Sequence, residues 1–298
     1  MRMIQSALEA GLRQTMRRLV RPLLNPRISL PVQRVLIRQA YHTSRPPRGS
    51  QFEAFKCGGV PARRVTCNRT GKGVLLYFHG GGYILGSPET HRGLTGHLAQ
   101  ATGNTVIVPD YRLAPEHPWP AALDDALAAY QALLDDGHRA GDIAVAGDSA
   151  GGGLTLALAM RLRDLELPLP ACLTVFSPWT DLSNSQLAEP DCEPVLTKAW
   201  IDKAARHYAG DTPFDEPLLS PVYGDLKGLP PLLIQAGSQE ILLNDAVRLA
   251  ERAREHDVHT VFEIYNELWH VFQVHAGQLE RATEAIRAAA SHITGRQS

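Results

Sequence analysis

The chain has 298 residues, of which 44% are hydrophobic and 20% charged, a balance that excludes a disordered or fibrous protein. Its net charge of −1 excludes a strongly basic surface for nucleic acid and favours a small neutral partner. The length fits one large α/β core with a small addition. Its four cysteines show no CxxC spacing, so we expect free thiols, no disulfide and no metal site.

The first 48 residues contain ten arginines, no lysine and a single acid, Glu9. Apolar residues and arginines each recur every four positions on different faces, which predicts an amphipathic helix over residues 6–24, ending near Pro22. Such a segment fits a transit peptide, a membrane-surface helix or a part of the fold, and its simplest interpretation is an exposed arginine face. No apolar run approaches the roughly 18 residues of a membrane span, and no signal peptide is recognisable. We therefore expect a cytoplasmic protein.

From Gln51 onward, short apolar strands alternate with stretches of helical periodicity. Strands are predicted at 74–78, 105–109, 143–147, 172–177, 231–236 and 260–265. Amphipathic stretches such as 121–134 and 154–165 lie between most of them. This alternation predicts an α/β fold in which helices cover a buried, mostly parallel sheet.

Two further segments depart from this alternation. Residues 52–56 and 63–67 are strand-like and are separated by a Gly58-Gly59 turn, which predicts an antiparallel edge. Residues 183–220 contain several prolines and no clear strand. We interpret this region as an insertion above the sheet.

The turn after the predicted strand 143–147 carries a GxSxG sequence with Ser149 at its centre. Ligands of parallel sheets bind beyond the carboxyl ends of the strands, so this position is exposed to a ligand. A sharp strand-to-helix turn needs small neighbours, here Gly147 and Gly151, because larger side chains would collide with the strand or the helix. Ser149 is therefore a candidate nucleophile. The alternative is a serine that only caps the following helix.

The sequence HGGGY follows the predicted strand 74–78 and begins at His79. Consecutive glycines let backbone N–H groups point into a cavity, where they can stabilise an oxyanion. A phosphate site is less favoured, because the P-loop lysine and the spaced GxGxxG are both absent from this stretch. The expected donors are the N–H groups of Gly81, Gly82 and Ala150. Tyr83 is expected to contact substrate, and His79 to fix the loop.

Four stretches carry a resemblance to a known family: HGGG at 79–82, YRLAPEHPWPAA at 111–122, GDSAGG at 147–152 and SPWTDLS at 177–183. In this order they resemble the bacterial hormone-sensitive-lipase family of α/β-hydrolase-fold esterases. The resemblance extends from about Phe52 to the C-terminal helix. It implies a serine carboxylesterase with an eight-stranded, mostly parallel sheet and a helical cap. The cap would comprise residues 1–50 and the insertion 183–220, and the core residues 51–182 and 221–298.

The stretch LLIQAGSQEILLND offers two candidates for the acid of a triad, Glu240 and Asp245. The family places its acid in a D-P-L or D-x-L turn after the penultimate core strand. The matching tripeptide here, 240–242, has glutamate in place of aspartate. Glu240 precedes His270 by 30 positions, which matches the family, whereas Asp245 precedes it by 25. Glu240 is therefore the expected acid, and Asp245, at the start of a predicted helix, is the alternative.

His270 follows the last predicted strand and completes the chain order nucleophile, acid and histidine that is typical of α/β hydrolases. Its neighbours Trp269 and Phe272 also fit a histidine packed in the core. His275 is expected inside the last helix. The order of the three groups favours His270 as the general base.

Together these residues predict hydrolysis of small to medium carboxylic esters through an acyl-enzyme, without a cofactor. Asp148, Glu116 and Asp181 lie in the family motifs and are expected to brace the site. Lactone hydrolysis is the alternative, because the length and the stretch 58–61 are also similar to lactone hydrolases. A non-catalytic ligand-binding protein on the same fold is less favoured, since it need not keep nucleophile, histidine and glycines together. We expect a monomer or a homodimer.

Overall fold

The computed structural model describes residues 2–41, 44–67, 71 and 73–298. Within these residues eight strands form one sheet in the order β1-β2-β4-β3-β5-β6-β7-β8. They are Gln51–Cys57 (β1), Val60–Thr66 (β2), Val74–Phe78 (β3), Thr105–Pro109 (β4), Ile143–Asp148 (β5), Cys172–Phe176 (β6), Leu232–Gly237 (β7) and Thr260–Tyr265 (β8). β2 is antiparallel to both β1 and β4, and the other neighbouring pairs are parallel. The predicted mostly parallel, eight-stranded sheet is confirmed.

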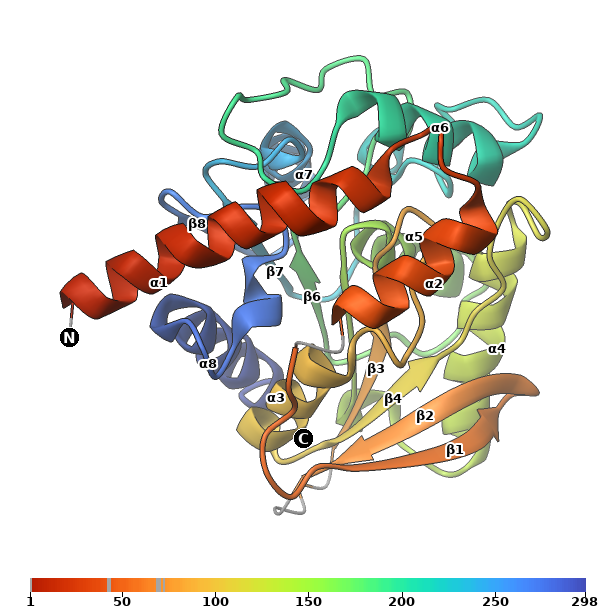
Figure 1. Ribbon diagram of the computed structural model, residues 1–298. Helices are drawn as coiled ribbons and strands as arrows, with labels where there is room; N and C mark the ends of the chain where they lie inside the picture. Colours follow the sequence, from red (N-terminus) through yellow and green to blue (C-terminus); the bar gives the residue numbers. More distant parts are fainter. Residues whose placement is uncertain (1, 42–43, 68–70, 72) are drawn as a thin grey trace.

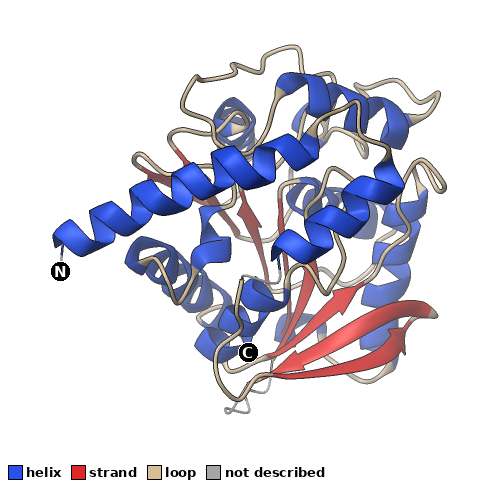
Figure 2. Cartoon of the chain, in the orientation of Figure 1, coloured by secondary structure: helices blue, strands red, loops and turns tan. Residues whose placement is uncertain are grey.

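The central strands are apolar throughout because both faces of the sheet are covered. Successive side chains of a strand point to opposite faces, so Leu75 and Tyr77 of β3 enter one core while Leu76 and Phe78 enter the other. Helices α3 and α8 close the first core, and α4, α5 and α7 close the second (Figure 2). Their bounds are Arg92–Thr102 (α3), Ala121–Asp135 (α4), Ala150–Asp164 (α5), Leu243–Glu255 (α7) and Glu280–Thr294 (α8).

The hairpin of β1 and β2 forms one edge of the sheet (Figure 2). Gly58 and Gly59 make its turn, with φ of 59° and 81°. Glycine adopts this left-handed conformation without steric cost. At Gly58 a side chain would also collide with the carbonyl of Ala128 in α4. The predicted antiparallel edge is confirmed.

The N-terminal segment is helical for most of its length and crosses the side of the sheet toward which the arrowheads of β4 and β6 point (Figure 1). It consists of α1 (Arg2–Thr15), a π-helical turn (Met16–Val20) and a 3₁₀ turn (Arg21–Leu24), followed by α2 (Leu30–Tyr41). The helix predicted over residues 6–24 is therefore present but begins earlier. It leaves α geometry before Pro22, which cannot donate the hydrogen bond that an α-helix requires.

The arginines of this segment do not form a purely solvent-exposed face, contrary to the simplest interpretation of the sequence. Arg17 donates to the carbonyl of Asp191 at 3.0 Å, and Arg21 donates to the carbonyl of Glu193 at 2.6 Å. Arg21 also pairs with the Glu189 carboxylate at 3.1 Å. The arginine face thus binds the backbone of the 189–193 segment.

The region 183–220 contains helix α6 (Lys198–Ala209). The resemblance implied a helical cap here, but the bounds of this helix were not predicted. The Thr197 hydroxyl caps its first turn by accepting from the Trp200 N–H. Residues with helical spacing form its buried face: Trp200, Ile201, Ala204, Ala205 and Tyr208. The cap residue and this spacing are the signals that would have revealed the helix.

The segment after β8 turns once as a 3₁₀ helix (Phe272–His275) before α8 begins at Glu280. The prediction that His275 lies in the last helix is wrong, because Gly277, at φ 81°, separates the two elements. In the described part of the chain no helix has the length and apolar character needed to cross a membrane.

Candidate active site

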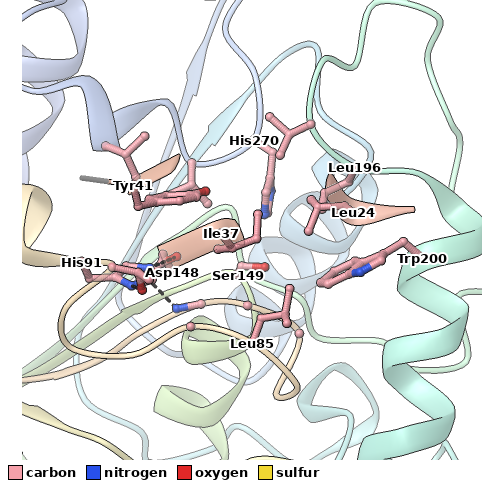
Figure 3. Close-up of a pocket in the computed structure, with 18 residues that line it drawn as sticks. Leu24, Ile37, Tyr41, Leu85, His91, Asp148, Ser149, Leu196, Trp200 and His270 are labelled. Atoms are coloured by element: carbon pink, nitrogen blue, oxygen red, sulfur yellow. Dashed lines mark hydrogen bonds and ion pairs between the residues drawn. The ribbon is translucent and has the colours of Figure 1, made fainter. Parts of the chain in front are cut away.

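Ser149 and His270 line a common cavity of about 60 Å³. In Figure 3 their side chains face the same space, with Trp200 on one side and Tyr41 on the other. Gly81 and the other glycines of the HGGG sequence line it as well. Apolar side chains supply most of the remaining wall: Leu24, Ile37, Leu85, Val195, Leu196, Trp200, Val271 and Val274.

Ser149 occupies a sharp turn between β5 and α5. Its backbone has φ 53° and ψ −120°, a conformation that costs a non-glycine residue free energy and occurs mainly at functional sites. A side chain at Gly147 would collide with the Gly151 carbonyl, and one at Gly151 with the carbonyl of Phe78. The Ser149 N–H is held by the Phe176 carbonyl at 2.8 Å. The GxSxG glycines therefore meet the steric demand that the sequence predicted, and the serine side chain stands at the cavity.

The glycine loop lies directly beside Ser149. The Gly80 N–H is bound to the Asp148 carboxylate at 3.0 Å, which fixes the start of the loop. Among the described residues, none accepts a hydrogen bond from the N–H groups of Gly81, Gly82 or Ala150. Gly81 and Gly82 line the cavity and have positive φ, of 121° and 62°. Unpaired backbone donors at such a position can stabilise a developing negative charge.

His79 lies behind the loop. Its ring stacks on Tyr111 with centroids 4.3 Å apart, and its Nδ1 lies 2.9 Å from the Gly80 carbonyl. Burial, and next the charge of His91, lower the pKa of His79 to about 3. The ring is therefore neutral near neutral pH. These contacts support the predicted structural place of His79 in the loop.

His270 and Glu240 form a buried pair. Nδ1 of His270 lies 3.9 Å from Oε1 of Glu240, and neither atom has another hydrogen-bond partner in the described residues. At this distance the interaction is one of charge rather than a hydrogen bond. Burial alone would lower the pKa of His270, but the negative charges of Glu240, Glu193 and Asp148 outweigh it and raise the pKa.

The second carboxylate oxygen of Glu240 is firmly held. Oε2 accepts from the Ser177 hydroxyl at 2.7 Å and from the Gly237 N–H at 2.8 Å. The Ser177 hydroxyl in turn accepts from the N–H of Val271 at 3.0 Å. Ser177 therefore connects the acid to the residue that follows His270. This residue lies in the SPWTDLS stretch, but its role was not predicted.

Asp245 does not approach His270 through any described contact. It lies in the first turn of α7, and its Oδ2 accepts from the N–H groups of Thr180 and Asp181, both at 2.9 Å. Burial is the main reason why the pKa of Asp245 rises to about 7. The two candidate acids therefore differ in their contacts. Glu240 faces His270, whereas Asp245 binds the backbone of the SPWTDLS loop.

Tyr83 does not line the cavity, so the expectation that it contacts substrate is not supported. Its ring is buried and stacks on Tyr208 of α6 with centroids 3.6 Å apart. Its backbone has φ 60°, and its carbonyl accepts from the Ala114 N–H. The turn that points the preceding glycines toward Ser149 directs this side chain away, into the contact between loop and α6.

The three motif acids each bind a neighbouring segment. Asp148 accepts from the Tyr77 hydroxyl at 2.6 Å as well as from Gly80, and lies 3.3 Å from His91. Its pKa is lowered although burial opposes the charge, because His91 and the hydroxyl stabilise the carboxylate. Glu116 pairs with Arg34 of α2 at 2.7 Å.

Asp181 pairs with Arg248 of α7 at 2.6 Å. No group of three or more His, Cys, Asp or Glu side chains in the described ranges is arranged to hold a metal ion. The cavity brings together a serine hydroxyl, an imidazole and unpaired backbone N–H groups, which can supply nucleophilic, acid–base and oxyanion-stabilising chemistry.

Comparison with known proteins agrees with this geometry. A family with the description alpha/beta hydrolase fold matches residues 75–274. An acetyl-hydrolase of Streptomyces hygroscopicus is 43% identical and covers 74% of this chain and 75% of its own length. An esterase of Acinetobacter venetianus is 37% identical over 82% of each chain. The crystal structure of an esterase from the bacterial hormone-sensitive lipase family superposes with a TM-score of 0.91 at 35% identity, covering 99% of this chain and 98% of that one.

Proposed function

Because the chain belongs to the bacterial hormone-sensitive-lipase family of α/β-hydrolase-fold esterases, we propose that it hydrolyses short-chain carboxylic esters through an acyl-enzyme on Ser149. The observation that carries this proposal is the meeting of Ser149, His270 and unpaired glycine N–H groups in one cavity. Nucleophile, base and oxyanion donors are the three requirements of acyl transfer by a serine enzyme.

In the first half of the reaction, neutral His270 accepts the proton of Ser149 as its hydroxyl oxygen attacks the ester carbonyl. The carbonyl oxygen becomes an oxyanion and accepts hydrogen bonds from the N–H groups of Gly81, Gly82 and Ala150. The imidazolium then donates its proton to the departing alkoxide, which leaves an acyl group on Ser149. Water, deprotonated by the same imidazole, releases the acid in the second half.

Glu240 supports both halves by stabilising the imidazolium. Its Oε1 faces Nδ1 of His270, and its Oε2 is anchored by Ser177 and Gly237. In the resting structure the 3.9 Å separation leaves both atoms without a closer partner. Catalytic hydrogen bonds of this kind often tighten only in the substrate complex.

The size of the cavity favours a small acyl group. Its volume is only about 60 Å³. An acetyl group fits such a space, whereas a long acyl chain requires movement of the wall. The acetyl-hydrolase activity named for the Streptomyces relative supports the same substrate class.

The cavity wall also supports the division of the chain into core and cap, with residues 1–50 and 183–220 as the cap. Leu24 and Ile37 from the first segment and Leu196 and Trp200 from the second line the same cavity as Ser149, which belongs to the core. Substrate must therefore pass between the two cap segments or beside them to reach the serine.

The test is a panel of p-nitrophenyl esters of increasing acyl length, together with lactones, on the wild-type chain and on Ser149→Ala. We expect the highest kcat/KM for acetate, falling with chain length, and loss of all turnover in the variant without a change in melting temperature. Ser185→Ala, the same change at an exposed position outside the cavity, is the control. Turnover by Ser149→Ala near the wild-type rate would overturn the proposed nucleophile. Faster hydrolysis of lactones than of any ester would overturn the substrate class.

A further inference from the structure

Glu193 is a buried acid that the sequence did not single out. It lies in the 183–220 region, just before α6, and its side chain is inaccessible to solvent. Oε1 accepts from the N–H of Val195 at 2.6 Å and from that of Leu196 at 3.2 Å. Oε2 accepts from the N–H of Ile241 at 3.0 Å. One carboxylate thus joins the cavity wall to the turn that carries Glu240.

The contact with Ile241 is made at a position that matters for catalysis. Ile241 follows Glu240 directly, so the Glu193 carboxylate restrains the backbone beside the proposed triad acid. Glutamate has one more rotatable bond than the aspartate usual in this position, and Oε1 of Glu240 has no hydrogen bond to fix it. Restraint of the turn therefore limits how far that oxygen can move from His270.

The N-terminal helix holds the same turn from the other side. Arg13 donates to the side-chain carbonyl of Gln239 at 2.6 Å, and also to the Cys192 carbonyl at 3.5 Å. Arg21 donates to the carbonyl of Glu193 itself at 2.6 Å. The residues before and after Glu240 are thus connected to the N-terminal segment and to the 189–193 segment, both of which belong to the proposed cap.

Glu193 also acts on His270 through its charge. Burial raises the pKa of Glu193, while the charge of His270 and the N–H donors on its carboxylate oppose that rise. Three backbone donors on one carboxylate favour its ionised form. The negative charges that face His270 are those of Glu240, Glu193 and Asp148.

We propose that Glu193 is a positioning residue of the esterase reaction: its carboxylate fixes the turn that carries Glu240 and thereby holds the Glu240 carboxylate toward His270. This inference rests on the proposed function of Ser149, His270 and Glu240. It assigns to the cap a part in arranging the triad in addition to enclosing the substrate.

The test compares Glu193→Gln and Glu193→Asp with Glu189→Gln. Glutamine removes the charge and places an NH₂ group against backbone donors, so we expect kcat for p-nitrophenyl acetate to fall roughly 10- to 100-fold with little change in KM. The acid limb of the pH–rate profile should move to lower pH by roughly one unit, because loss of a nearby negative charge lowers the pKa of His270. Glu189→Gln makes the same chemical change in a surface ion pair and should alter neither quantity.

Aspartate keeps the charge but shortens the reach, so Glu193→Asp should lower kcat while leaving the acid limb in place. An NMR titration of the His270 ring in a Ser149→Ala background measures the charge effect without turnover, so this proposal and the proposed function can fail separately. The proposal is overturned if folded Glu193→Gln keeps the wild-type kcat and acid limb. It is also overturned if both Glu193 variants have a lower melting temperature but keep the wild-type kcat and acid limb. The same conclusion follows if Glu193→Gln does not fold and Glu193→Asp retains the wild-type kcat.

Discussion

Replacing Glu240 by glutamine exchanges a carboxylate for an amide of the same shape at a site with defined contacts. The amide oxygen can accept the two hydrogen bonds that Ser177 and Gly237 donate to Oε2. The NH₂ group then takes the place of Oε1 and faces Nδ1 of His270, to which it can only donate. The imidazole is thereby held with its proton on Nε2, the nitrogen that must accept a proton from Ser149.

The expected loss follows from this wrong tautomer. A triad acid replaced by its amide lowers kcat by roughly 10⁴ in the best-studied serine protease, or about 5 kcal/mol of transition-state stabilisation. Because both anchoring hydrogen bonds of Glu240 can persist, the melting temperature should change little. The pKa of His270 should also fall, since Glu240 is the strongest of the charges that raise it.

The assay is kcat for p-nitrophenyl acetate as a function of pH, with circular dichroism to confirm folding, and Asp245→Asn is the matched control. Asparagine can accept from both N–H groups that Asp245 binds, so kcat should stay near the wild-type value.

The raised pKa of Asp245, about 7, means that its ionisation destabilises the fold as pH rises from about 4 through 7, by a few kcal/mol at most. Asp245→Asn should therefore be more stable relative to the wild type above pH 7 than below pH 5. Loss of kcat in Asp245→Asn, with activity retained in Glu240→Gln, would refute the assignment of the acid.

Two further variants test the cavity wall. Gly81→Ala puts a methyl group against the carbonyl of Leu85 at a φ of 121°, so the loop must reorient. We expect kcat to fall roughly 10²- to 10³-fold with a smaller change in KM. A rise in KM alone would mean that the loop only binds substrate. Trp200→Ala enlarges the cavity beside Gly82 and should raise kcat/KM for hexanoate relative to acetate, while lowering the free energy of unfolding by about 3–5 kcal/mol. An unchanged chain-length profile would show that Trp200 does not limit the acyl group.

The parts of the site that were predictable from the sequence are those whose physical requirement is local. The elbow at Ser149 needs small residues within two positions of the serine, and the HGGG loop needs glycine at consecutive positions, so both leave a pattern in the sequence. The buried strands were predictable for a similar reason, because a strand covered on both faces is apolar at every position.

The remaining parts depend on contacts between distant segments. Ser177 reaches Glu240 across 63 positions, and Glu193 reaches Ile241 across 48, so nothing near either residue marks its role. A contact of Tyr83 with substrate was predicted because its neighbours in the sequence line the cavity, whereas its own side chain turns toward α6. The direction of one side chain at a positive φ depends on the tertiary structure and not on its neighbours in the sequence.

The cavity is lined by residues as far apart in the sequence as Leu24 and Val274, so it can form only after both have been synthesised. A ribosome makes the chain from its N-terminus, and the strand and helix around Ser149 emerge long before His270 does. A nascent chain therefore carries the proposed nucleophile, Ser149, before the proposed base, His270, has been translated. Because the proposed mechanism needs both residues, esterase activity is expected only after the segment around His270 has left the ribosome and folded, so its appearance during translation would report completion of the native sheet.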